Sequence, residues 1–204
     1  MVAHPLLRGK VGATVKKVLG MLGSPRSDGC AAQLLDSALE GARSAGAETE
    51  RLDLAAVDIR PCRGCGRCDA SASCVQTRDD MARVYALVRQ VDAIVLSSPV
   101  FFMGVTAQTK AMIDRCQCFW VEKYVMKKRV YEGRDRPKGL FLSCAGSPKP
   151  AIFEPSLHIA KAFFAAIDYH YTGEVLLGHT DDPDLGPRMK AALQQAFDAG
   201  ARLV

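Results

Sequence analysis

The chain has 204 residues, a length that suits one α/β domain with an extension, and its 49% apolar and 24% charged residues are usual for a soluble globular protein. The net charge of +5 is too small and too dispersed to indicate a nucleic-acid partner, and no apolar run approaches the roughly 18 residues that cross a membrane. Residues 1–10 also lack the apolar stretch of a secretory signal. We therefore expect a cytoplasmic protein whose eight cysteines are ligands, reactive thiols or core residues more often than disulfides.

After an irregular arm at residues 1–13, predicted strands and helices alternate along the chain. The runs that predict strands lie at 15–22, 48–54, 93–96, 140–142 and 169–177. Apolar residues at helical spacing predict helices at 34–42, 81–88, 106–116, 157–167 and 189–197. The second strand is polar enough for a sheet edge, and Asp79 or Asp80 can cap the second helix. This alternation indicates a parallel sheet covered on both faces and wound by right-handed crossovers.

The loop that follows the first strand has the parts of a phosphate site. In an open α/β sheet, ligands bind beyond the carboxyl ends of the strands. The sequence GSPRSDGC at 23–30 leads directly into a helix. The hydroxyls of Ser24 and Ser27, the guanidinium of Arg26 and the free N–H groups of the helix start suit a phosphate monoester. On its own, the loop is equally well explained as a tight turn with a surface arginine.

The loop after the third strand, SSPVFFMG at 97–104, is unusually apolar. Loops are generally solvated, yet this one has four consecutive apolar residues: Val100, Phe101, Phe102 and Met103. Such side chains suit a flat aromatic ring, and Gly104 would allow the backbone to approach that ring closely. The alternative is that these residues fold into the core. A third loop, SCAGS at 143–147, follows the fourth strand.

Four cysteines lie in the pattern C-x2-C-x2-C-x5-C: Cys62, Cys65, Cys68 and Cys74. Four thiolates so close together, separated by Gly64 and Gly66, can wrap around one compact ion or cluster. Zinc sites more often use two separated pairs of ligands, whereas the overlapping C-x2-C-x2-C run is typical of ferredoxin-type clusters. The spacing therefore predicts a 4Fe–4S cluster, with zinc, disulfides or vacant thiols as the alternatives.

Together these segments resemble the flavodoxin-like NAD(P)H-dependent FMN reductase family. The resemblance lies in GSPR at 23–26, SSPVFFMGVTAQTKAMIDR at 97–115 and SCAGS at 143–147, and the compact cysteine motif is similar to that of the iron–sulfur flavoprotein branch. It implies a doubly wound, five-stranded parallel sheet in the order 2-1-3-4-5 with helices on both faces. Residues 14–204 would form this single domain, with the cysteine-rich loop as an insertion at 60–78.

The resemblance also implies which residues bind FMN. The phosphate would be held by Ser24, Arg26 and Ser27. The isoalloxazine ring would be held by two groups of residues: Pro99, Val100, Phe101, Phe102, Met103 and Gly104, and Ser143, Cys144, Ala145 and Gly146. One departure is at Cys30 and Ala31, where relatives commonly have an Asn-Thr pair, so one phosphate-binding hydroxyl is missing.

The function implied by the resemblance is electron transfer from a ferredoxin-like donor or NAD(P)H, through the cluster and FMN, in a homodimer or homotetramer. No side-chain acid or base is needed, because the cofactors perform the chemistry. Two alternatives are an NAD(P)H-dependent FMN or quinone reductase without a functional cluster and a non-catalytic, zinc-stapled binding module. We also expect the basic segment 119–138 to place Trp120 and Tyr124 at a subunit contact or the flavin entrance, with its lysines and arginines facing an acidic partner.

Overall fold

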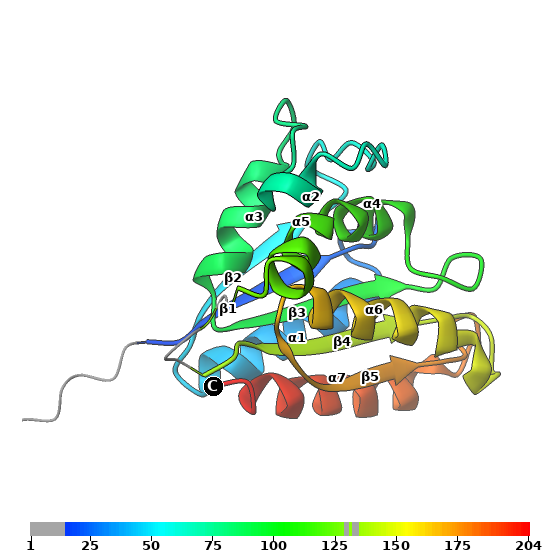
Figure 1. Ribbon diagram of the computed structural model, residues 1–204. Coiled ribbons are helices and arrows are strands. Elements are labelled where there is room, and N and C mark those ends of the chain that lie inside the picture. Colours follow the sequence, from blue (N-terminus) through cyan, green and yellow to red (C-terminus); the bar gives the residue numbers. More distant parts are fainter. Residues whose placement is uncertain (1–14, 129–130, 132–134) are drawn as a thin grey trace, which may run out of the picture.

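The computed structural model describes residues 15–128, 131 and 135–204, which form a central sheet between two layers of helices (Figure 1). The sheet consists of β1 (Lys17–Leu22), β2 (Glu48–Asp53), β3 (Ala93–Pro99), β4 (Lys138–Cys144) and β5 (His170–Leu177). All neighbouring strands are parallel, and their order is β2-β1-β3-β4-β5. The predicted flavodoxin-like sheet is therefore confirmed, including the edge position of the polar strand β2. The predicted arm at 1–13 lies outside the described residues.

Helices pack on both faces of the sheet because the strands present apolar side chains in both directions. Within β1, Leu19 and Met21 pack into one core, and Val18 and Leu22 pack into the other, as the two-residue period of a strand requires. One face is covered by α1 (Cys30–Ser44) and α7 (Leu185–Ala201). The other is covered by α3 (Met81–Gln90), α4 (Ala107–Arg115) and α6 (Glu154–Ala166). None of the helices in this part of the chain has both the length and the apolar character that a membrane crossing requires.

Short helical elements that the sequence did not predict join the longer ones. Two of them, the single turn α2 (Cys68–Ser71) and α5 (Gln117–Trp120), lie near the cysteine segment. A π-helical turn, η1 (Val121–Val125), continues α5, and a 3-10 turn, η2 (Pro150–Phe153), precedes α6. All are too short to show a helical period in the sequence.

Two glycines allow α1 and α7 to pack backbone to backbone. A Cβ atom added at Gly41 would overlap the carbonyl of Phe197, and one added at Gly200 would overlap the carbonyl of Ala38. Since backbone atoms cannot rotate out of the way as side chains do, the helices would have to separate. The glycines therefore set the distance between α1 and α7.

Gly200→Ala should lower the free energy of unfolding by about 1–3 kcal/mol, because the overlap forces backbone shifts in a packed core. Gly186 lies on the same helix with open space around it. Gly186→Ala is the matched control and should instead raise the free energy of unfolding by up to about 1 kcal/mol through helix propensity. Urea unfolding measures both effects. Equal changes at the two positions would contradict the close packing of α1 and α7.

Candidate functional site

Most of the residues predicted to bind flavin line one cavity of about 280 Å³. It lies beyond the carboxyl ends of β1, β3 and β4. The predicted residues that line it are Ser24, Arg26, Pro99, Val100, Phe101, Cys144, Ala145 and Gly146. We call this space the flavin cavity. Its other lining residues are Gly29, Cys30, Ala31, Thr180 and Asp181.

Five predicted flavin residues are not among those that line the cavity: Ser27, Phe102, Met103, Gly104 and Ser143. The hydroxyl of Ser143 is buried and donates to the carbonyl of Ser98 at 2.8 Å, which holds β3 and β4 together. Phe102 and Met103 form the tip of a tight turn closed by hydrogen bonds between Phe101 and Gly104, with φ of 47° and 66°. The Phe102 side chain is fully exposed. The structure therefore separates this apolar tip from the cavity.

The start of α1 forms the part of the flavin cavity that suits an anion. Gly29 is the N-cap residue, no side chain caps the helix, and its first turn has no acidic residue. Uncapped N–H groups and the helix dipole favour a negative group at this place. The exposed guanidinium of Arg26 lies on the same loop, where the Ser24 hydroxyl accepts the N–H of Arg26 at 3.0 Å. These donors fit the phosphate of FMN.

Two residues of the flavin cavity that the sequence analysis missed come from the loop after β5. The N–H of Thr180 donates to the carbonyl of Ala145 at 3.1 Å, which brings this loop against the loop after β4. A Cβ atom at Gly146 would overlap the carboxylate of Asp181. Cys144 is buried beside them, and burial raises the pKa of its thiol to about 12. Cys144 is therefore a neutral thiol at neutral pH.

Helix α4 begins beside the phosphate loop, whose residues Ser24 and Arg26 line the flavin cavity. Its N-cap residue, Thr106, donates its hydroxyl to the carbonyl of Gly23 in the phosphate loop at 2.6 Å. The Thr109 hydroxyl then donates to Thr106 at 2.9 Å and occupies the space that a Cβ atom at Gly23 would need. The first turn of α4 is therefore fixed to the loop that carries Ser24 and Arg26.

All four cysteines of the motif line a second cavity, of about 480 Å³, which we call the cysteine cavity. Cys68 belongs to α2, which lies near the top of Figure 1. The wall of the cavity is completed from the end of α4 and from α5 by Asp114, Arg115, Gln117 and Cys118. Gly64 and Gly66 have φ of 59° and 67°, which allows the chain to turn sharply between the thiols. Cys118 is a fifth cysteine at this cavity, and its side chain is buried.

The thiols share this cavity without converging on one point. Within residues 15–128, 131 and 135–204, no group of three or more His, Cys, Asp or Glu side chains has the arrangement of a metal site. The four cysteines nevertheless have the chemistry of a metal site, since four thiolates are common ligands of a 4Fe–4S cluster or of zinc. Cys62 and Cys65 are exposed on a loop with few packing contacts, so they can close around a bound group.

A buried ion pair fixes both ends of the cysteine segment to α4. The side chains of Arg115 and Asp79 are 0% and 1% exposed and approach to 2.5 Å. Arg115 also donates to the carbonyl of Arg60 at 2.9 Å, before the first cysteine, and to that of Gln76 at 2.8 Å, after the last. Asp79 accepts the N–H groups of Arg60 and Met81. The Nε–H of Arg115 has no acceptor among the described residues, which fits a further group in the cavity.

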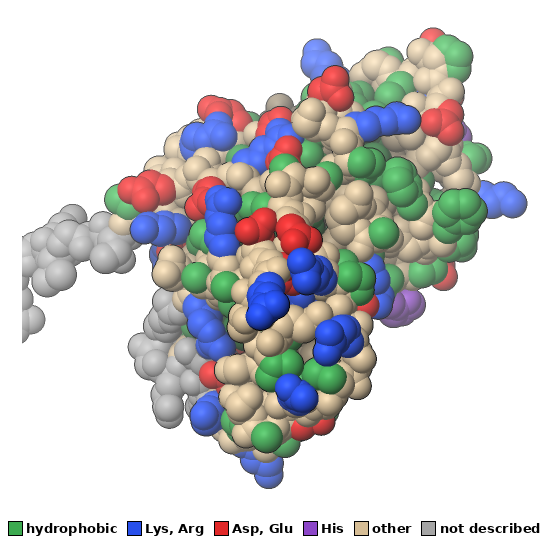
Figure 2. Space-filling view, turned by 90° about the horizontal axis from the view of Figure 1, so that it is seen from above, with side chains coloured by type: hydrophobic (Ala, Val, Ile, Leu, Met, Phe, Trp, Pro, Cys, Tyr) green, Lys and Arg blue, Asp and Glu red, His purple; other side chains and the backbone are tan. Residues whose placement is uncertain are grey.

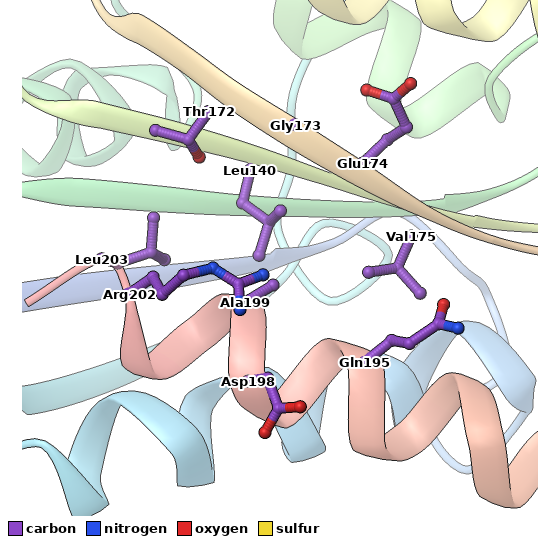
Figure 3. A pocket seen from close by; sticks show the side chains of 10 residues that line it. All are labelled: Leu140, Thr172, Gly173, Glu174, Val175, Gln195, Asp198, Ala199, Arg202 and Leu203. Atoms are coloured by element: carbon purple, nitrogen blue, oxygen red, sulfur yellow. The ribbon is translucent and has the colours of Figure 1, made fainter.

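A third cavity, of about 330 Å³, lies between β5 and α7, and its side chains are not arranged as a ligand-binding site (Figure 3). Thr172 and Glu174 point to the other face of β5, and Asp198 points away from the sheet. The side chains that point into the space are apolar apart from Gln195 and Arg202: Leu140, Val175 and Leu203. Its polar groups therefore do not converge on a ligand.

The aromatic and basic segment after α4 lies on the surface. The rings of Trp120 and Tyr124 are half-exposed and 5.6 Å apart between centroids, and they are not among the residues that line the flavin cavity. Lys127 and Lys128 are exposed, and Figure 2 shows Lys and Arg side chains gathered on a protruding part of one face. The rest of this segment lies partly outside the described residues, at 129–130 and 132–134.

Residues 16–152 match the model of the NADPH-dependent FMN reductase family. Because this match covers more than half of the chain, the chain belongs to that family. The class predicted from the sequence, a flavin-dependent oxidoreductase, is confirmed at this level. Membership also supports FMN as the cofactor and NADPH as a partner.

Curated relatives confirm the predicted branch. The chain is 46% identical over 99 residues to an iron–sulfur flavoprotein of Archaeoglobus fulgidus. These 99 residues make up 48% of this chain and 44% of the relative. It is 32% identical over 131 residues to an iron–sulfur flavoprotein of Methanosarcina thermophila, 64% of each chain. The chain therefore spans 44% and 64% of the lengths of these two relatives. A solved NAD(P)H:quinone oxidoreductase of Methanothermobacter marburgensis shares the fold, with a TM-score of 0.67 and 19% identity over 93% of this chain and 97% of the other.

Proposed function

We propose that this protein is an electron-transfer oxidoreductase that binds FMN in the flavin cavity and a 4Fe–4S cluster on Cys62, Cys65, Cys68 and Cys74. Its donor is a ferredoxin-like protein. When bound, the cluster exchanges single electrons and FMN exchanges one or two, so the pair can join a one-electron donor to a two-electron acceptor.

The observation that carries this proposal is that α4 is bonded at one end to the loop that lines the flavin cavity and at the other end to the segment that lines the cysteine cavity. The helix starts at Thr106, which is bonded to the phosphate loop, and ends at Arg115, which is bonded to both ends of the cysteine segment. A chain that only bound FMN would have no need of four thiols held against the other end of the same helix.

The chain's own residues have separate tasks in this proposal. Arg26 and the N–H groups at the start of α1 hold the phosphate, while Pro99, Val100 and Phe101 pack against the ring. The four cysteines supply thiolates, and the exposed Lys127 and Lys128 face an acidic donor protein. The exposed apolar tip at Phe102 supports assembly into a homodimer or homotetramer, which sedimentation velocity measures.

The competing function is an NADPH-dependent FMN or quinone reductase without a functional cluster, which the family's description favours. A non-catalytic, zinc-stapled module is not supported, because the chain belongs to a reductase family. Protein purified without oxygen and assayed for metals separates the two remaining functions. A brown protein with about four irons per chain that accepts electrons from reduced ferredoxin supports our proposal. A yellow, iron-free protein that oxidises NADPH would overturn it.

Arg26→Ala should weaken FMN binding about ten- to a hundredfold, since a charge-assisted hydrogen bond to phosphate contributes about 1.5–3 kcal/mol. Riboflavin, which lacks the phosphate, should bind the variant as well as it binds the wild type. Arg83, an exposed arginine on α3, provides the control, and Arg83→Ala should affect neither ligand. Quenching of flavin fluorescence measures both affinities. An equal loss for FMN and riboflavin would show that Arg26 acts on folding instead.

A further inference from the structure

Arg115 has a buried hydrogen-bond donor that the described residues leave unused. One terminal nitrogen of its guanidinium donates to Asp79 and to the carbonyl of Arg60, and the other donates to Asp79 and to the carbonyl of Gln76. Its Nε–H is buried without an acceptor among these residues, although buried N–H groups nearly always have one. The donor is therefore free to bond to a group in the cysteine cavity, which Arg115 lines.

Cys74 is the group next to Arg115 that can become such an acceptor. Both residues line the cysteine cavity. Burial opposes the charge on Arg115, but Asp79 and then the Cys74 sulfur favour it, and the pKa of Arg115 is raised overall. The Cys74 sulfur therefore lies within reach of the Arg115 guanidinium, while the Nε–H itself has no acceptor among the described residues. A neutral thiol is a weak acceptor, whereas a metal-bound thiolate carries negative charge and accepts strongly.

We propose that the Nε–H of Arg115 donates a hydrogen bond to the sulfur of Cys74 when Cys74 binds the cluster, and that this bond raises the reduction potential of the cluster. The inference rests on the function proposed above. Reduction adds negative charge to the cluster, so a donor aimed at one of its sulfurs stabilises the reduced form more than the oxidised form. Asp79 neutralises the charge of the guanidinium. The potential is therefore raised by the N–H dipole that points at the sulfur, and not by a net positive charge.

The decisive variant combines Arg115→Met with Asp79→Asn. It leaves no N–H donor at position 115 and removes one charge of each sign, so no uncompensated charge stays buried. We titrate the iron-loaded protein with reductant and follow the cluster by electron paramagnetic resonance. The equilibrium constant for one-electron reduction should fall at least tenfold, so the reduction potential should be lower by about 59 mV or more. The control removes an exposed ion pair of the same charges, Arg83→Met with Glu50→Gln, and should leave the potential unchanged.

Two single variants separate donation from a merely structural role. Asp79→Asn leaves the guanidinium charge uncompensated and should raise the potential, in the direction opposite to the double variant. Arg115→Lys keeps the ion pair but has no Nε–H, so it should lower the potential and serves as a second route if the double variant does not fold.

Wild-type potential in variants that keep their full iron content would overturn the inference. Loss of iron from both the double variant and Arg115→Lys would also overturn it, because Arg115 would then hold the cluster instead of tuning its potential. Wild-type protein that takes up no iron on anaerobic reconstitution would instead overturn the proposed function.

Discussion

Alanine in place of Cys65 is expected to abolish iron binding and the visible absorbance of the cluster while FMN remains bound. Cys65 is exposed, lines the cysteine cavity and is the second thiol of the C-x2-C-x2-C-x5-C motif. Cysteine thiolates hold a 4Fe–4S cluster, so a missing thiol leaves it incomplete. The two cavities share no lining residue, so the flavin is not affected. Iron assay and absorbance after anaerobic reconstitution measure both cofactors.

Cys118→Ala is the matched control for this prediction. Cys118 lines the same cavity but lies outside the motif, and its buried sulfur faces the carbonyl of Arg115 at 3.7 Å. We expect this variant to keep all of its iron. The ligand assignment would be wrong if Cys65→Ala kept wild-type iron content or if Cys118→Ala lost it.

Asp79→Ala should lower the free energy of unfolding by about 3–5 kcal/mol, because it leaves the guanidinium of Arg115 buried without its partner. Urea unfolding at pH 7 measures this loss. The exposed pair of Asp58 and Arg60, 3.8 Å apart in the same segment, provides the control. Asp58→Ala should change the free energy of unfolding by about 1 kcal/mol or less. A loss at Asp79 no larger than this would show that the buried pair contributes little to stability.

The contribution of Asp79 should depend on pH in a defined direction. Burial alone would raise the pKa of Asp79, but hydrogen bonds from Arg115 and from the N–H groups of Arg60 and Met81 lower it overall. A carboxyl with a lowered pKa stabilises the folded state fully above its unfolded pKa of about 3.9, and it loses this effect as pH falls through the folded value. The stability difference between wild type and Asp79→Ala should therefore shrink in acid. A difference that grows on acidification would contradict the ion pair.

The sheet could be predicted from the sequence because its signals are local. Residues 93–96 are apolar throughout, and they lie in the central strand β3, which is buried on both faces. The start of α4 was predicted at Thr106, and that residue caps the helix. Strand ends were predicted less well. β4 extends from Lys138 to Cys144 because it pairs along its whole length with β3, and pairing partners are not visible in a single segment.

The contacts that organise the candidate site could not be predicted, because they join residues far apart in the sequence. Asp79 was expected to cap a helix, and its carboxylate does accept the N–H of Met81 at 3.3 Å, but its main partner is Arg115, 36 residues away. No periodicity links such positions. Asp181 reaches the flavin cavity only because β5 lies beside β4.

The length of α4 has a consequence for how far apart the two cavities can lie. Its nine residues rise about 13 Å at 1.5 Å per residue, so the helix acts as a spacer of fixed length. Inserting one residue would rotate Arg115 by about 100° relative to Thr106, away from Asp79 and the cysteine segment. Insertions close to whole turns, such as seven residues for nearly two turns of about 5.4 Å each, come nearest to restoring both attachments. The spacing between the phosphate loop and the cysteine segment can therefore change in discrete steps but cannot be adjusted continuously.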